Sequence, residues 1–274
     1  MPVKLNFQVL GEGPTVVILH GLCGSLGNWR MMAKQLSANH RVVTVDLRNH
    51  GKSAHTGSMT YVEMAEDVLH LITDQSLRNI TLVGHSMGGK AVMAAALMQP
   101  ELSDRIIVMD IAPVRYAHRY GKLLSAMRDL PLPGIKNRNE AEKMLDALIN
   151  DPELARFLLQ NLVKTGNGYA WRLNLPSLRT NIEDISGFPD FGPHAQFRKP
   201  ALFLGGVNSY FIRPEHHPVI HGFFPKAEIE PIADAGHMLH LDQPEIVLDK
   251  IRRFITPLKG TAKVVSRDKP AQVR

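Results

Sequence analysis

The stretch ITLVGHSMGGK (80–90) decides how the rest of the chain is interpreted. Its first five residues are mostly apolar and β-branched, which is typical of a strand buried on both faces. The turn GHSMG (84–88) follows, and the small, apolar residues up to Met98 favour a helix packed on a sheet. A serine held at a sharp strand-to-helix turn, with a glycine two residues away on each side, is the pattern of an activated nucleophile. We therefore predict that Ser86 is a nucleophile, and not an incidental serine in a glycine-rich turn.

The composition indicates a globular protein. The chain has 274 residues, of which 44% are hydrophobic and 21% charged, and no apolar run approaches the length of a membrane span. The start MPVKLNFQVL alternates like a strand and lacks the apolar core of a signal peptide. The single cysteine, Cys23, excludes an internal disulfide framework. These features predict a cytoplasmic protein without a membrane span.

The net charge of +6 is concentrated near the C-terminus. Residues 259–274 carry five Lys or Arg against one acidic residue, Asp268, and are otherwise polar. We interpret this segment as a solvated, mobile basic tail rather than a nucleic-acid or membrane site. The sequence therefore predicts no nucleic-acid partner, and it leaves the oligomeric state open.

Apolar runs alternate with helical patterns along the chain, which predicts an α/β protein with a mostly parallel, doubly wound sheet. Helical spacing occurs at 61–72, 86–98, 140–149, 152–163 and 244–255, and the expected strands lie at 15–20, 41–46, 80–84, 105–111, 201–205 and 227–231. The strand starts at 105 and 201 are too far apart for one βα crossover. We predict a helical lid at 113–185, inserted into a core formed by 1–112 and 186–258, where it would cover the carboxyl ends of the strands.

The loop HGLCG (20–24) follows the first buried strand. In this architecture that loop and the residue after the nucleophile supply the two backbone N–H groups of an oxyanion hole. Leu22 and Met87 occupy these positions. We expect His20 to be a buried structural histidine that bonds loop backbone.

Thirteen histidines compete for the role of general base. His237 follows the last expected strand, where the chain order serine, acid, histidine places the base. His240 is the nearest rival, whereas three others, at 216, 217 and 221, occupy a loop-like segment. No cysteine cluster or HExxH spacing supports a metal site, and no cofactor is predicted.

The acid is less easily chosen from spacing. The residues after the 201–205 strand, GGVNSYFI (205–212), contain no carboxylate, so Asp110 at the end of the preceding strand is the alternative. Asp234 is close to His237 in sequence and would need a tight bend to reach its ring. Two further aspartates, at 46 and 242, belong to other parts of the expected fold.

With these residues assembled, the chain resembles the serine hydrolases of the α/β-hydrolase fold over about residues 3–257. More closely, the segments HGLCGSLGNW (20–29), GHSMGGKAV (84–92), MDIAPVRY (109–116) and AGHMLHLDQPE (235–245) are similar to the YbfF-like esterases. The resemblance implies that Asp110 is the acid and that Ser209 assists the histidine. The glycine pair of that group usually stands directly before Asn-Ser, whereas Val207 intervenes here.

The resemblance implies a carboxylic ester hydrolase that acts on small-molecule acyl esters or acyl-CoA thioesters. Lid residues Arg115 and Tyr116 are candidate substrate-binding residues, although a solvated basic helix is the simpler interpretation. The same residues would serve a C–C bond hydrolase or a perhydrolase, and a non-catalytic ligand-binding protein on this fold is an alternative from a different class. An intact serine, histidine and oxyanion set favours an enzyme.

Overall fold

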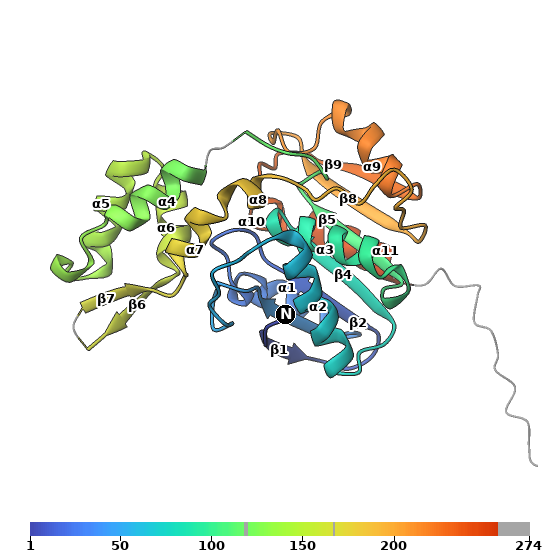
Figure 1. Ribbon diagram of the computed structural model, residues 1–274, viewed down its shortest axis with the longest axis horizontal. Coiled ribbons are helices and arrows are strands. Elements are labelled where there is room, and N and C mark those ends of the chain that lie inside the picture. The colour runs from blue at the N-terminus through green and yellow to red at the C-terminus, as the bar shows by residue number, and fades with distance from the viewer. Residues whose placement is uncertain (118–119, 167, 257–274) are drawn as a thin grey trace, which may run out of the picture.

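The computed structural model describes residues 1–117, 120–166 and 168–256, with a seven-stranded sheet at its centre (Figure 1). The strand order is β1-β3-β2-β4-β5-β8-β9, and all neighbouring pairs are parallel except β1 with β3. The predicted strands and the mostly parallel sheet are thus confirmed. The strands are β1 (Asn6–Leu10), β2 (Thr15–Leu19), β3 (Arg41–Asp46), β4 (Ile80–His85), β5 (Arg105–Met109), β8 (Ala201–Gly206) and β9 (Ala227–Ile232).

Helices cover both faces of the sheet because alternate strand residues point to opposite sides and nearly all of them are apolar. Val16, Val83 and Leu202 face one layer of helices, formed by α1 (Arg30–Leu36) and α11 (Pro244–Ile255). Val17 and Leu82 face the other layer, formed by α2 (Tyr61–Asp74), α3 (Met87–Met98) and α9 (His217–Phe223). Short helical elements complete the core: η1 (Leu26–Trp29), η2 (Pro100–Leu102), η4 (Pro214–His216) and α10 (Leu239–Asp242).

The chain between β5 and β8 forms a separate layer at one end of the core (Figure 1). It contains α4 (Tyr120–Asp129), η3 (Leu132–Gly134), α5 (Arg138–Ile149), α6 (Pro152–Leu159), β6 (Leu162–Thr165), β7 (Gly168–Trp171), α7 (Leu175–Thr180) and α8 (Ile182–Ser186).

Two predictions about this insertion need correction. The helix expected at 152–163 ends at Leu159, and β6 and β7 form an antiparallel hairpin, so the insertion is not wholly helical. Apolar residues at 158, 159 and 162 continue the helical spacing past the true end of the helix. The glycines at 166 and 168 then favour a hairpin, which outweighs that spacing.

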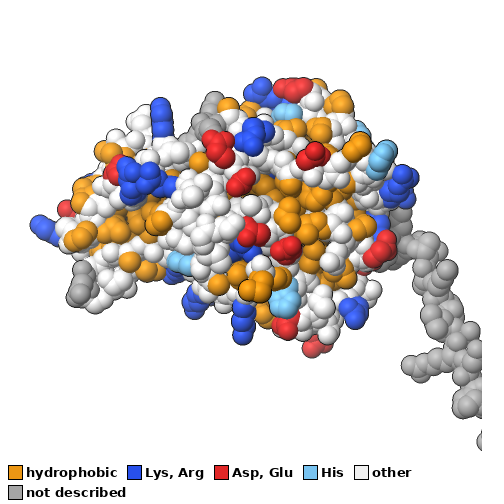
Figure 2. Space-filling model, in the orientation of Figure 1, with side chains coloured by type: hydrophobic (Ala, Val, Ile, Leu, Met, Phe, Trp, Pro, Cys, Tyr) orange, Lys and Arg blue, Asp and Glu red, His pale blue; other side chains and the backbone are white. Residues whose placement is uncertain are grey.

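Within the described ranges, no helix is long and apolar enough to cross a membrane. On the face drawn in Figure 2, acidic and basic side chains are interspersed with apolar ones over both the core and the insertion. The predicted basic tail, 259–274, lies outside the described residues.

Candidate active site

Ser86 lies at the sharp turn between β4 and α3 with φ 53° and ψ −120°, a conformation that non-glycine residues rarely adopt. Its backbone N–H donates to the carbonyl of Met109 on β5 (2.9 Å), which holds the turn at the carboxyl edge of the sheet. A Cβ atom on Gly88 would lie 2.6 Å from the carbonyl oxygen of His20, and one on Gly84 would lie 2.3 Å from that of Gly88. Both glycines are therefore needed for the strand and helix to approach this closely.

His237 follows β9 and lies beside Ser86. Its Nε2 atom is 3.0 Å from Ser86 Oγ, and its Nδ1 atom is 2.7 Å from Asp110 Oδ2. Phe211 stacks on the imidazole ring at a centroid distance of 4.1 Å. The Nε2 atom of His85 is 2.7 Å from the backbone carbonyl oxygen of His237. Stacking and hydrogen bonding thus fix the ring between the serine and the carboxylate.

Asp110 is fully buried at the end of β5. Its Oδ1 accepts a hydrogen bond from the Gly206 N–H (3.0 Å), and its Oδ2 accepts one from Ser209 Oγ (2.5 Å) in addition to the contact with His237. These donors fix the orientation of the carboxylate. The structure therefore brings together Ser86, His237, Asp110 and Ser209 in the arrangement that the sequence predicts.

The alternative acids face elsewhere. The carboxylate of Asp242 accepts from the backbone N–H of Gly236 (2.8 Å), and Asp234 is exposed to solvent. Asp46 accepts hydrogen bonds from three groups of the 6–52 region, namely the Asn6 side chain and the N–H groups of Leu26 and Lys52.

The predicted oxyanion groups lie next to Ser86. Met87 is the first residue of α3, where a backbone N–H has no acceptor within the helix, and Leu22 lines the cavity that contains Ser86. His20 supports this loop, because its Nε2 accepts from the Leu47 N–H (3.0 Å) and its Nδ1 bonds the Gly21 carbonyl (2.8 Å). The structural role expected for His20 is confirmed.

The rival histidine, His240, is buried against Trp29, with ring centroids 4.4 Å apart. Neither of its ring nitrogens has a hydrogen-bond partner among the described residues. Burial, together with the charge of His237, lowers the pKa of His240 to about 4. The histidines at 216, 217 and 221 belong to η4 and α9, so they do not form the loop that the sequence suggested.

Cys23 lies in the loop with Leu22 and links it to the insertion. The carbonyl of Cys23 accepts a hydrogen bond from the side chain of Asn161 (2.7 Å), which is itself buried. The thiol is buried, and burial raises its pKa to about 12, which disfavours the thiolate form that a nucleophile requires.

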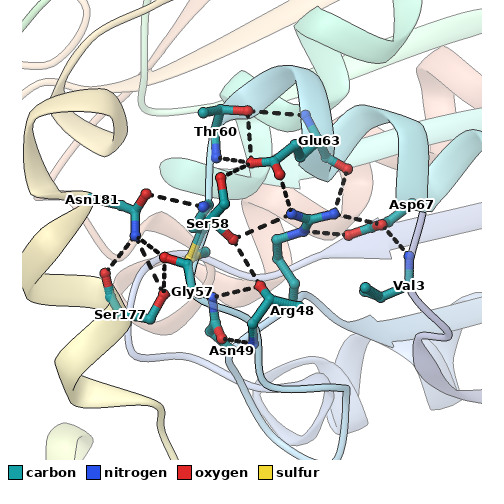
Figure 3. Close-up of polar contacts among 12 residues, drawn as sticks. Val3, Arg48, Asn49, Gly57, Ser58, Thr60, Glu63, Asp67, Ser177 and Asn181 are labelled. Atoms are coloured by element: carbon teal, nitrogen blue, oxygen red, sulfur yellow. Dashed lines mark hydrogen bonds and ion pairs between the residues drawn. The ribbon is translucent and has the colours of Figure 1, made fainter. Parts of the chain in front are cut away.

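A buried polar seam joins α7 and the start of α8 to the core loop 47–60 (Figure 3). Asn181 accepts from the Met59 N–H (3.1 Å) and donates to the Gly57 carbonyl (2.8 Å). The amide of Asn49 donates to Ser177 Oγ (3.1 Å). The insertion is therefore fixed to the core along its second half.

The core side of that seam is held by a buried ion pair (Figure 3). The Arg48 guanidinium donates to both carboxylate oxygens of Asp67, at 2.7 and 2.9 Å, and pairs with Glu63 at 3.1 Å. Asp67 also accepts from the backbone N–H of Val3 (2.7 Å). These bonds fix the 47–60 loop to α2, so the insertion docks on a rigid surface.

A cleft of about 970 Å³ opens above Ser86 and His237, between the core and the insertion. Most of its lining is apolar: Leu22, Phe211, Met238 and Leu241 come from the core, and Tyr120, Leu123, Leu148, Ile149, Leu154 and Phe157 come from the insertion. Its charged residues are Lys122, Arg156, Asp151, Glu153 and Asp242. The cleft suits an apolar group attached to an uncharged reacting centre.

Arg115 and Tyr116, the candidate substrate-binding residues, do not line this cleft. The guanidinium of Arg115 forms an ion pair with Glu183 (3.2 Å), and the side chains of Arg115 and Glu183 are both mostly exposed. The Tyr116 hydroxyl donates to the Phe211 carbonyl (2.5 Å) and accepts from the Ala112 N–H (2.9 Å). Tyr116 does line a much smaller cavity next to Ser86. A substrate-binding role for these two residues stays a prediction.

Two further residues lie at the site: Tyr120, which the sequence suggested only as one of several lid residues that could face anionic groups, and Lys90, which the sequence analysis missed. Tyr120 lines both cavities beside Ser86. Burial raises the pKa of its hydroxyl, and a side-chain hydrogen bond with Ser86 partly offsets that effect. Lys90 is buried on α3, and the available signal was a charged residue in an otherwise apolar helix.

Comparison with known proteins agrees with this geometry. The profile of the α/β-hydrolase fold family matches residues 14–244. The chain belongs to this family. It is 38% identical over 267 residues to an sn-1-specific diacylglycerol lipase, ABHD11, of Danio rerio, covering 93% of this chain and 84% of the relative. It is 34% identical over 241 residues to the esterase YbfF of Escherichia coli K12, covering 88% of this chain and 92% of the relative.

A solved structure described as a marine microorganism esterase superposes with a TM-score of 0.89 at 36% identity. The match covers 92% of this chain and 99% of the other. The fold expected from the sequence is thus confirmed, and the α/β hydrolase described here is a serine hydrolase of the esterase and lipase class.

Proposed function

We propose that this α/β hydrolase cleaves carboxylic esters through an acyl-enzyme formed on Ser86. The observation that carries the proposal is the continuous line of hydrogen bonds from Asp110 through His237 to Ser86, which ends at the floor of an apolar cleft. This line has the order of contacts that serine hydrolases use to activate a hydroxyl.

In the first half of the reaction, Ser86 Oγ attacks the carbonyl carbon of the ester and passes its proton to His237 Nε2. Asp110 fixes the tautomer that leaves Nε2 free and stabilises the imidazolium that forms. The N–H groups of Leu22 and Met87 bind the oxyanion. When the tetrahedral intermediate collapses, the alkoxide leaves with the proton from Nε2, and the acyl group remains on Ser86.

In the second half, His237 takes a proton from a water molecule, which attacks the acyl carbonyl. The second tetrahedral intermediate collapses, Ser86 recovers its proton from His237, and the carboxylic acid leaves. The stacked Phe211 ring holds the imidazole in place through both halves.

We further propose that the insertion 113–185 is a lid whose apolar side chains bind the acyl chain of the substrate. Leu123, Leu148 and Phe157 lie across the cleft from Met238 and Leu241 of the core. Acyl esters of small to medium length suit this lining. The ABHD11 relatives, named for diacylglycerol, make glycerides a natural extension of the substrate set.

Acyl-CoA thioesters are the second candidate, because Lys122 and Arg156 line the cleft and could meet phosphate groups. Asp151, Glu153 and Asp242 outnumber these two cations. The balance of charge therefore favours uncharged esters over a polyanionic thioester.

A fluorophosphonate probe and a panel of p-nitrophenyl and CoA esters test the proposal together. The wild type should be labelled at Ser86 and hydrolyse the esters, whereas Ser86→Ala should lose labelling and at least about 10³-fold in kcat with an unchanged fold. A wild type without labelling or turnover would identify a non-catalytic ligand-binding protein. A C–C bond substrate or hydrogen peroxide, supplied in parallel, would reveal the other reactions open to these residues.

A further inference from the structure

Lys90 is a buried lysine one helical turn after Ser86 on α3. Lys90 is only 1% exposed. Its ammonium nitrogen, Nζ, donates hydrogen bonds to the carbonyls of Val114 (2.8 Å), Ser186 (3.0 Å) and Gly187 (2.5 Å). An ammonium has three N–H donors, so the three carbonyls account for all of them. The site is thus a complete cation cage built from backbone oxygens.

The three carbonyls come from the two segments that connect the insertion to the core. Val114 lies in the segment that leaves β5, and Ser186 and Gly187 lie where α8 returns towards β8. The N–H of Tyr116 also donates to the carbonyl of Ser186 (3.0 Å), so the two connecting segments lie side by side. One ammonium therefore joins both ends of the insertion to the helix that begins at Ser86.

A buried lysine at this position carries a cost in free energy, which its hydrogen bonds to the three carbonyls must offset. Burial, together with the nearby charge of Arg115, lowers the pKa of Lys90 to about 7. The rings of Tyr61 and Tyr116 flank the ammonium, at 5.5 and 4.9 Å from their centroids. An apolar side chain of similar length would avoid the cost of burying a charge but could not bind the carbonyls.

We propose that Lys90 is a positioning residue that fixes both ends of the 113–185 insertion to the nucleophile helix and so determines how tightly long acyl chains bind. This inference rests on the proposed function only in taking Ser86 as the nucleophile and the insertion as the wall that contacts the acyl chain. The link between the lysine and the two connecting segments does not depend on catalysis.

The consequence is a dependence on substrate length. Leu148 and Phe157 of the insertion line the cleft together with Ser86, and a long acyl chain would contact them while an acetyl group would not. Loosening the connecting segments should therefore weaken the binding of long chains and leave the reaction of short ones nearly unchanged. Tyr120, which follows the first connecting segment, would lose its fixed position in the same way.

The test compares Lys90→Met with Lys199→Met, a matched control. Lys199 also donates to a backbone carbonyl, that of Ser103 (3.1 Å), but it lies away from the insertion. Hydrogen exchange of the Tyr116 and Gly187 amides reports on the connecting segments directly. KM and kcat for p-nitrophenyl acetate and p-nitrophenyl decanoate report on substrate binding.

In Lys90→Met, exchange at both amides should rise at least about tenfold, because a hydrogen bond to a charged donor is worth more than a factor of ten. KM should rise about tenfold for the decanoate and less than about twofold for the acetate, with similar kcat values. Lys90→Gln, which keeps two N–H donors, should fall between the wild type and Lys90→Met, and it replaces that variant if the methionine protein does not fold.

Exchange and decanoate KM equal to those of Lys199→Met would overturn the proposal. So would an equal loss for both esters, because the damage would then be general and not confined to the insertion. If the wild type hydrolyses neither ester and Ser86 is not labelled, the proposed function fails, while hydrogen exchange still decides whether Lys90 holds the connecting segments.

Discussion

Replacing Asp110 with asparagine should reduce kcat by about 10⁴-fold, which corresponds to about 5 kcal/mol of transition-state stabilisation. The substitution conserves volume, and asparagine tolerates the φ of 50° found at this position, so the fold should survive. In the native protein, His237 Nδ1 lies 2.7 Å from the Asp110 carboxylate. The neutral amide of asparagine cannot replace that carboxylate as a negatively charged acceptor. The imidazole then adopts the wrong tautomer, and its cation is left without a counter-charge.

Ser209→Ala provides a graded comparison. Its hydroxyl donates a 2.5 Å hydrogen bond to the same carboxylate oxygen, and a bond to a charged group contributes about 1.5–3 kcal/mol. We therefore expect a loss of roughly 10- to 150-fold in kcat, well below that of Asp110→Asn. The Gly206 N–H and His237 still hold the carboxylate in this variant.

Steady-state kinetics on p-nitrophenyl butyrate would measure both losses, with thermal unfolding as the check on folding. Asp234→Asn is the matched control, since that aspartate is close to His237 in sequence but is exposed. Its kcat should stay within about twofold of the wild type. A folded Asp110→Asn protein that keeps more than about a tenth of the wild-type kcat would refute the assigned role.

Three other predictions concern the structure around the site. Arg48→Met should lower the free energy of unfolding in urea by about 3–5 kcal/mol by leaving the Asp67 carboxylate buried and unpaired. Adding Asp67→Leu should recover part of the loss, and no recovery would contradict the ion-pair explanation. Burial, with a neighbouring histidine, lowers the pKa of His240 to about 4. Between pH 6.5 and 4 the unfolded chain therefore binds a proton that the folded protein excludes, and stability falls as the pH falls. His240→Phe should flatten this dependence and raise the unfolding free energy at pH 5 by about 2 kcal/mol, whereas a lower unfolding free energy at pH 5 would contradict this explanation. Gly88→Ala should abolish soluble, active protein because its Cβ would meet the His20 carbonyl, and a fully active variant would be inconsistent with the turn geometry.

The sheet could be predicted from the sequence because each strand is a short run of apolar, mostly β-branched residues. The expected run at 80–84 differs from β4 by one residue, and the run at 41–46 matches β3. Both strands are buried along nearly their whole length, so each appears in the sequence as a continuous run of mostly apolar residues. The insertion is harder to predict from the sequence, because its helices are partly exposed. In addition, the helical spacing of its apolar residues continues past the end of α6 at Leu159 into the hairpin.

The candidate site likewise contains some residues that could be placed from the sequence and others that could not. Ser86 and His237 could be placed from local sequence, since each follows a strand and the chain order of such sites is known. Ser209 depended on resemblance alone, because its contact with Asp110 requires β5 and β8 to be neighbours in the sheet. The environment of Lys90 could not be predicted from spacing, because its three acceptors are backbone carbonyls 24 to 97 residues away.

The position of Asp110 also explains why the insertion and the candidate catalytic residues cannot be considered separately. Asp110 directly follows β5, and Val114, whose carbonyl binds Lys90, lies four residues later in the same connecting segment. Within that segment, the hydroxyl of Tyr116 bonds the carbonyl of Phe211, and the Phe211 ring stacks on His237. With the acid after β5, the same short stretch of chain carries the carboxylate, contacts the residue that stacks on the imidazole and joins the insertion to the core, so a displacement of the insertion would alter the hydrogen bonds among the candidate catalytic residues.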